Sequence, residues 1–320
     1  MERTLTEGFS QICPLYAFTT RGRVSQRVDL GEGIAISRIS YDLVRLIDKR
    51  IPELALDSNK VQWVIQLPFN PRRKRISKSQ TSLYSEVLES SSEIVIDLIT
   101  AIRLQHEGDV APGPLLQLDI RNRDFNLGET YYQFHVSKSG NYAFFAGASY
   151  ELFKTDLNSF TEFWQSFQDK RQKGKLDDLK IALRRFNSSY GEILEDRLLD
   201  QMIALESLYL VDPQELSYRL ALRAAFLIGA DEKQRKQVLN DLKDAYNARS
   251  KIIHGKKPPA NLPELVVKTE ECLRQSIRHI LKLSDKYKLK QLRGPLDKAN
   301  QQEDPLFDQN ILSAGKLLRA

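Results

Sequence analysis

The sequence predicts an α+β N-terminal domain followed by an all-α antiparallel helical bundle. Short runs rich in β-branched and aromatic residues are confined to residues 1–150. Long amphipathic segments with short connections follow from residue 176 onward. The length of 320 residues is typical of two domains. We therefore expect a small α+β domain over 1–150, a helical connector over 151–175, a bundle over 176–290 and a polar tail over 291–320.

In the N-terminal domain the β-type runs are separated by turn signals rich in proline and glycine. They predict strands at 34–39, 61–67, 115–120, 131–136 and 142–145. Helical spacing of apolar residues predicts one helix over 85–104. The basic cluster Arg72, Arg73, Lys74 and Arg75 follows a proline-containing turn. It is a candidate for phosphate contacts, and a solvated loop is the alternative.

The C-terminal half has the apolar periodicity of helices almost throughout. Asp156 is placed to cap a first helix whose apolar residues extend from 157 to 167. The bundle helices are predicted at 176–186, 192–210, 213–228, 232–254 and 262–288. Gly255 follows the fourth of these segments and predicts a left-handed helix cap.

Composition and charge exclude several classes of protein. Hydrophobic residues make up 41% and charged residues 28%, which excludes collagen, low-complexity chains and disulfide scaffolds. Cys13 and Cys272 lie far apart without a CxxC pair, which argues against a thiolate zinc site and fits a reducing cytoplasm. The most apolar stretch, 93–104, contains charges and is too short to span a bilayer. We expect a cytoplasmic protein without membrane association, metal or cofactor. The net charge of +6 permits a polyanionic partner.

An arginine lies in the middle of an apolar helix face. Positions three and four apart share a face, and the two neighbouring apolar stripes of segment 232–254 both pass through Arg249. Lys243 and Asp244 fall off this face and are interpreted as ordinary solvent contacts. A buried guanidinium needs a partner, because an unpaired buried charge costs several kcal/mol. Glu206 lies on an apolar edge of segment 192–210, so the pattern predicts a Glu206–Arg249 pair across the bundle. A structural ion pair that sets helix register is the alternative interpretation.

His254 ends the same helix, five positions after Arg249. Five residues correspond to about 140° of rotation, so the two side chains of one regular helix point to different sides. They can serve one site if the helix opens near its end or if a second copy of the chain supplies the complement. A histidine that only satisfies last-turn carbonyls is the alternative.

The Arg249-to-His254 spacing matches the R-x4-H motif of HEPN domains, which are helical ribonuclease and nucleotide-binding modules. The surrounding runs ALESL (204–208), ELSYRLALRAA (215–225) and LKDAYNARSKIIHG (242–255) resemble the Apea-like HEPN group. The resemblance covers roughly residues 175–285. It implies a metal-independent RNA endonuclease, usually dimeric through this domain and often part of a toxin or phage-defence system. The candidate partners besides RNA and a second copy of the chain are a trigger ligand and an antitoxin or other regulatory protein.

The resemblance and the residue chemistry indicate the same reaction, in which a ribose 2′-hydroxyl attacks the adjacent phosphate. His254 would move protons and Arg249 would hold the phosphate. Ser250 would orient the phosphate, although the family often has Asn, Asp or His at that position. Glu206 would hold Arg249.

Arg219 and Arg223 lie one turn apart and are weaker candidates for RNA contacts, since an exposed charge row explains them equally well. The alternative function is a non-catalytic HEPN module that binds RNA, a nucleotide or a protein partner. In a further arrangement, compatible with the nuclease, residues 1–150 are a sensor or a substrate-recognition domain.

Overall fold

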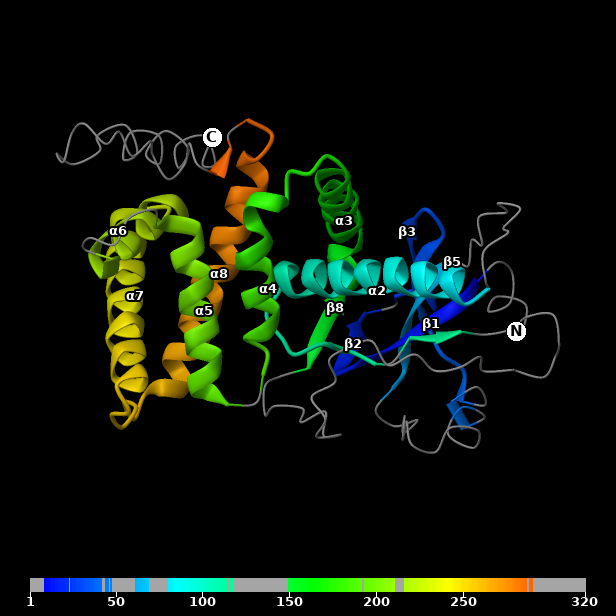
Figure 1. Cartoon of the computed structure of the whole chain (residues 1–320), viewed down its shortest axis with the longest axis horizontal. Helices are drawn as coiled ribbons and strands as arrows, with labels where there is room; N and C mark the ends of the chain where they lie inside the picture. The colour runs from blue at the N-terminus through cyan, green and yellow to red at the C-terminus, as the bar shows by residue number, and fades with distance from the viewer. Residues whose placement is uncertain are drawn as a thin grey trace. The chain divides into compact units, whose positions relative to one another are not determined.

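The computed structural model confirms the predicted fold class, a β-sheet region followed by packed helices (Figure 1). It describes residues 9–22, 24–41, 44–45, 47, 61–68, 80–113, 115–117, 149–191, 193–210, 216–286 and 288–289. The chain forms two compact units, Met1–Phe167 and Gln168–Ala320. The division falls inside α3 (Leu157–Gln172), which lies within the range expected to be a connector. The basic cluster Arg72, Arg73, Lys74 and Arg75, the strands expected at 131–136 and 142–145, and the tail 291–320 lie outside the described residues.

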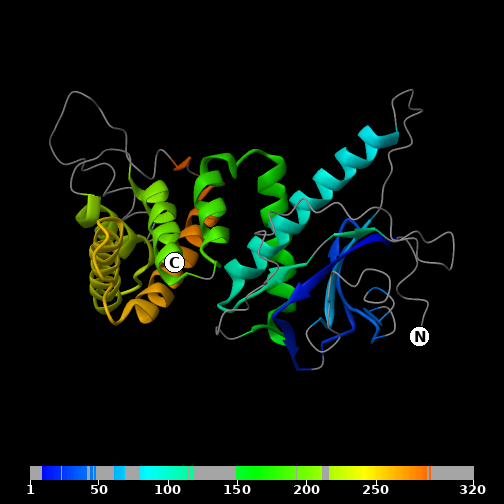
Figure 2. The same cartoon turned by 60° about the horizontal axis from the view of Figure 1, so that its bottom comes forward.

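The first unit contains an antiparallel sheet in the order β3-β4-β5-β1-β6, with β7 also paired to β1. Its strands are β1 (Phe9–Tyr16), β3 (Arg27–Gly31), β4 (Ile34–Arg38), β5 (Trp63–Pro68), β6 (Ala111–Pro112) and β7 (Leu116–Gln117). A second, parallel pair joins β2 (Phe18–Arg21) to β8 (Tyr150–Phe153). Figure 2 shows α2 (Gln80–Gln105) beside the larger sheet. The expected strands at 34–39 and 61–67 and the helix at 85–104 are therefore confirmed.

The sequence pattern missed the central strand β1. Pro14 argues against an interior strand because it donates no ladder hydrogen bond. Gln11 adds a polar residue, yet it is fully buried and accepts a hydrogen bond from the Ser91 hydroxyl of α2 at 2.6 Å. Tertiary packing gives the Gln11 Oε1 atom this partner, and the local sequence pattern contains no sign of it. The pattern also missed β8, which occupies the start of the range expected to be helical.

The second unit contains the five predicted bundle helices with small shifts at their ends. They are α4 (Lys180–Ser188), α5 (Leu194–Tyr209), α6 (Leu216–Ile228), α7 (Glu232–Ile253) and α8 (Leu262–Leu283). Helix α7 packs against α5, α6 and α8 (Figure 1). Its backbone begins at Asp231, whose side chain accepts a hydrogen bond from the Gln234 amide at 2.8 Å. Its last helical residue is Ile253, and Gly255, with a φ of 65°, forms the predicted left-handed cap after it.

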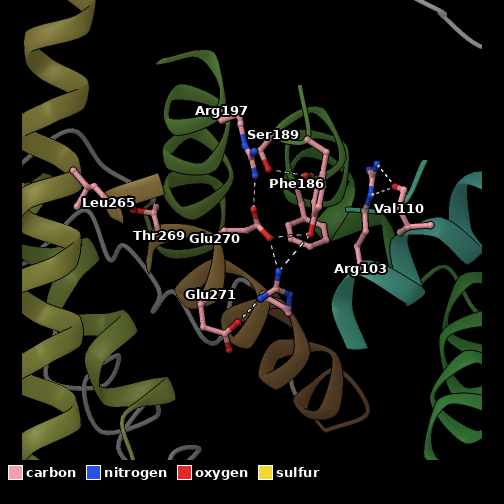
Figure 3. A network of polar contacts seen from close by, with 11 residues as sticks. Arg103, Val110, Phe186, Ser189, Arg197, Leu265, Thr269, Glu270 and Glu271 are labelled. Atoms are coloured by element: carbon pink, nitrogen blue, oxygen red, sulfur yellow. Dashed lines mark hydrogen bonds and ion pairs between the residues drawn. The ribbon is translucent and has the colours of Figure 1, made fainter. Parts of the chain in front are cut away.

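A buried ionic network connects α5, α8 and the turn that follows α4 (Figure 3). The Glu270 carboxylate accepts hydrogen bonds from the Arg197 guanidinium at 2.9 Å and from the Tyr190 hydroxyl at 3.1 Å. Arg274, one turn further along α8, also pairs with Glu270. Arg197, Glu270 and Arg274 are 9%, 7% and 3% exposed. Glu270 contacts two buried cations, of which Arg274 also pairs with Glu271, so the network sets the position of α5 against α8.

We predict that Glu270→Ala lowers the free energy of unfolding by about 3–5 kcal/mol, because it leaves two buried guanidinium groups without this carboxylate. Urea denaturation at neutral pH measures the change. Glu264→Ala on the same helix is the matched control, since Glu264 forms an exposed ion pair with Lys268. An equal loss of unfolding free energy in the two variants would show that the network adds no stability beyond that of a surface ion pair.

Candidate functional site

The predicted pair between α5 and α7 is confirmed. The Arg249 Nη2 atom lies 3.3 Å from Glu206 Oε2, and the two side chains are 22% and 21% exposed. The Arg249 guanidinium carbon also lies 5.4 Å from the centre of the Tyr246 ring, one turn earlier on α7. The guanidinium is therefore held at the edge of the bundle by a carboxylate and an aromatic ring.

The local sequence explains why this edge forms. Leu242, Ala245 and Ala248 are the buried residues of α7, and two of these three are small, which permits close packing of its backbone. Arg249 adjoins this buried stripe and is half-buried. On α5, Ile203 and Glu206 lie three positions apart on one face of the helix, and both are half-buried. The edge is therefore apolar on both helices except at the ion pair.

The ion pair retains hydrogen-bonding capacity. Among the described residues, neither Glu206 Oε1 nor Arg249 Nε has a hydrogen-bonding protein partner, although both atoms are buried. Burial raises the pKa of the Glu206 carboxyl, and the positive charge of Arg249 opposes this rise. The desolvation of the carboxylate thus exceeds the attraction of its single cationic partner.

His254 lies at the exposed C-terminal end of α7, and its backbone amide donates to the Ser250 carbonyl at 3.2 Å. Ser250 is half-buried. Within the described part of the chain, no hydrogen bond or ion pair joins His254 to Arg249. The structure therefore brings Glu206 and Arg249 together and leaves His254 on another side of the helix, as the five-residue spacing requires.

The weaker arginine candidates occupy α6. The Arg223 Nη1 atom donates to the Tyr209 carbonyl at 2.6 Å, at the C-terminal end of α5. This contact satisfies a helix-terminal carbonyl and gives Arg223 a structural role. Arg219, one turn earlier, is half-buried. The candidate cluster at residues 72–75 lies outside the described residues.

Sequence reasoning missed an exposed aromatic residue beside α7. Tyr218 of α6 is 50% exposed, and the Lys243 Nζ atom lies 5.2 Å from the centre of its ring. The sequence places Lys243 on the solvent side of α7, and we interpreted it there as an ordinary solvent contact. The partner ring comes from a different helix, so helical periodicity does not reveal it.

The described residues contain neither a metal-ligand cluster nor a helix that could span a membrane. They contain no group of three or more histidine, cysteine, aspartate or glutamate side chains placed to hold a metal ion. None of their helices combines the length and apolar character needed to cross a bilayer.

Comparison of the chain with protein-family models, curated proteins and solved structures found no match. The HEPN resemblance therefore remains a prediction from the sequence motif.

We predict that Glu206 makes stability fall with rising pH. Its raised pKa means that the folded chain binds this proton more tightly than the unfolded chain. Its favourable contribution is therefore complete below the ordinary pKa of 4.5 and is lost as pH rises through the higher folded value. Glutamine does not titrate, so the Glu206→Gln variant lacks this pH dependence.

The measurement is the difference in unfolding free energy between the wild type and Glu206→Gln, taken from denaturant curves between about pH 4 and pH 7. Wild-type stability should decline relative to the variant over this range. A relative increase with pH would show that the attraction of Arg249 outweighs desolvation.

Proposed function

We propose that this chain is a metal-independent RNA endonuclease of the HEPN type, which cuts at a site completed by a second copy of the chain. The observation that supports this proposal is a half-buried arginine, held by Glu206, with a histidine exposed at the end of the same helix. A permanently charged guanidinium suits a phosphate, and an accessible imidazole suits proton transfer.

In the proposed reaction, a neutral His254 accepts the proton of a ribose 2′-hydroxyl, and the oxygen attacks the adjacent phosphorus. The bond from phosphorus to the 5′-oxygen breaks, and this oxygen takes a proton from the partner's histidine or from water. The products are a 2′,3′-cyclic phosphate and a 5′-hydroxyl. Arg249 stabilises the charge that develops on the phosphate, with its guanidinium positioned by Glu206. Ser250 contributes a hydroxyl hydrogen bond to the same phosphate.

The two-copy arrangement follows from the geometry of α7. Arg249 and His254 are about 140° apart around the helix, and Leu239, Tyr246 and Ile253 lie in the sector between them. Ile253 is 53% exposed, so this sector presents apolar surface at the bundle edge. A two-fold dimer that buries this sector would place Arg249 of each copy near His254 of its partner.

In a cell, uncontrolled cleavage of RNA would stop growth. We therefore assign the nuclease to phage defence or toxin-type growth arrest, activated by a trigger ligand or restrained by an antitoxin or other regulatory protein. In this arrangement residues 1–150 are a sensor or a substrate-recognition domain.

A specific observation favours a second candidate function, a non-catalytic module that binds RNA, a nucleotide or a protein. In the single chain Arg249 already has a carboxylate partner, and His254 lies on a different side of α7. An arginine that serves only helix register would give the same contact. Cleavage assays separate the two functions.

We predict that His254→Ala abolishes RNA cleavage while the fold remains intact, because the side chain is exposed. Purified wild type and variant are incubated with total RNA in the presence of a chelator, and the cut ends are mapped. Wild type should leave cyclic phosphate and 5′-hydroxyl ends and should not cut DNA, which lacks the attacking hydroxyl. Lys282→Ala, an exposed change on α8, is the control and should retain activity. Full cleavage by His254→Ala, after nuclease contamination is excluded, would remove this histidine from the mechanism.

We predict that Arg249→Lys lowers the cleavage rate by about 100-fold or more, because lysine lacks the planar fork that contacts two phosphate oxygens. Single-turnover kinetics measure this loss. Arg249→Ala should also lower the free energy of unfolding, since it leaves the Glu206 carboxylate without its cation. If Arg249→Lys keeps the full rate, two-point phosphate recognition is wrong.

A further inference from the structure

The solvent side of α7 has a row of cations and amides. Lys236, Asn240, Lys243, Asn247 and Lys251 are spaced by four, three, four and four positions, so they share one face of the helix. We call them the α7 polar row. All are exposed except Lys243, which is half-buried. His254 follows three positions after Lys251 on the same side of the helix.

No carboxylate lies within this row. The three acidic residues of α7 are Glu232, Asp241 and Asp244. Glu232 lies four positions before Lys236 at the N-terminal end of the same face, and Asp241 faces α8, where its Oδ1 atom lies 3.4 Å from Lys268 Nζ. Asp244 is exposed at the border of the row, about 20° around the helix from Lys251, so the row has more lysines than bordering carboxylates. The neighbouring helix α6 contains no aspartate or glutamate over residues 216–228.

In the described part of the chain, Lys236, Lys243 and Lys251 form no ion pair. Many other cations of the second unit do form ion pairs, namely Lys170, Lys173, Lys175, Arg185, Arg197, Arg249, Lys268 and Arg274. Lys256 and Lys257 extend the exposed positive charge beyond the end of α7. This face therefore presents net positive charge to solvent and suits a polyanion.

Tyr218 adds an aromatic surface beside the row. Its ring is half exposed and lies 5.2 Å from the ammonium group of Lys243. An exposed aromatic ring next to a cation suits a nucleobase, which can stack on the ring while the cation contacts the adjacent phosphate. The asparagine amides between the lysines can donate to and accept from base edges.

We propose that the outer face of α7 binds single-stranded RNA. The lysines of the α7 polar row contact phosphates, Tyr218 stacks on a base, and the strand continues to His254. Lys236 and Lys251 are separated by about 22 Å along the helix, which accommodates several nucleotides. This inference rests on the proposed function for its substrate, and it adds the surface that holds the strand outside the reacting phosphate.

The test compares RNA affinity in two triple variants of the full chain, both in the His254→Ala background so that the probe is not cut. The row variant is Lys236→Gln, Lys243→Gln and Lys251→Gln. The matched control is Lys180→Gln, Arg184→Gln and Lys282→Gln, which removes three exposed cations that have no ion pair in the described part of the chain. Fluorescence anisotropy with a labelled single-stranded RNA is measured across a range of salt concentrations.

The row variant should bind about 100-fold more weakly than its parent at about 0.1 M salt, and its log–log salt slope should be smaller by about 2. The control should keep most of the affinity and the slope. Tyr218→Ala should weaken binding about tenfold, while Tyr218→Phe should retain it, because stacking requires only the ring.

The outcomes separate this inference from the nuclease proposal. Equal affinity of the row and control variants overturns the RNA-binding face, even if cleavage still depends on His254. A loss of RNA affinity in the row variant alone supports RNA binding by the outer face of α7, even if a chain with His254 intact cuts no RNA. Absence of RNA binding by the parent chain overturns the face.

Discussion

The central constraint of the second unit is the need to compensate a permanent positive charge at a half-buried helix edge. Arg249 cannot lose its proton, so the fold must provide a counter-charge where α7 meets α5. Glu206 provides it at 3.3 Å, at the cost of a raised carboxyl pKa. This single contact satisfies only part of the hydrogen-bonding capacity of the two side chains, since Glu206 Oε1 and Arg249 Nε lack protein partners within the described residues. The pair therefore retains capacity to bind a further group.

This constraint divides α7 into faces with different roles. The stripe of Leu242, Ala245 and Ala248 packs into the bundle. The edge beside it contains Arg249, and the opposite side has lysines and asparagines in contact with solvent. Helical geometry separates Arg249 from His254 by about 140°, so the proposed nuclease site uses a second copy of the chain. The proposed dimer edge and the proposed RNA face adjoin along α7, and they meet at His254 and Lys243.

Buried polar contacts position elements within each unit, and one of them supports this edge. Glu270 of α8 pairs with Arg197 of α5, the helix that also contains Glu206. The register of α5 against α8 therefore helps determine where the Glu206 carboxylate meets α7. In the first unit, the Ser91 hydroxyl of α2 donates to the buried Gln11 Oε1 atom of β1. Each of these contacts satisfies a polar group that would otherwise cost stability on burial.

Helix positions were predictable from the amino-acid sequence because periodicity, caps and breaks involve residues within a few positions of one another. The Glu206–Arg249 pair was predictable across 43 positions because each side chain interrupts an apolar stripe. The pairing of β1, the contact of Arg197 with Glu270 across 73 positions and the approach of Lys243 to Tyr218 became visible only in the folded chain. Packing between elements determines which of these groups meet. The residues next to each group in the sequence do not indicate its distant partner.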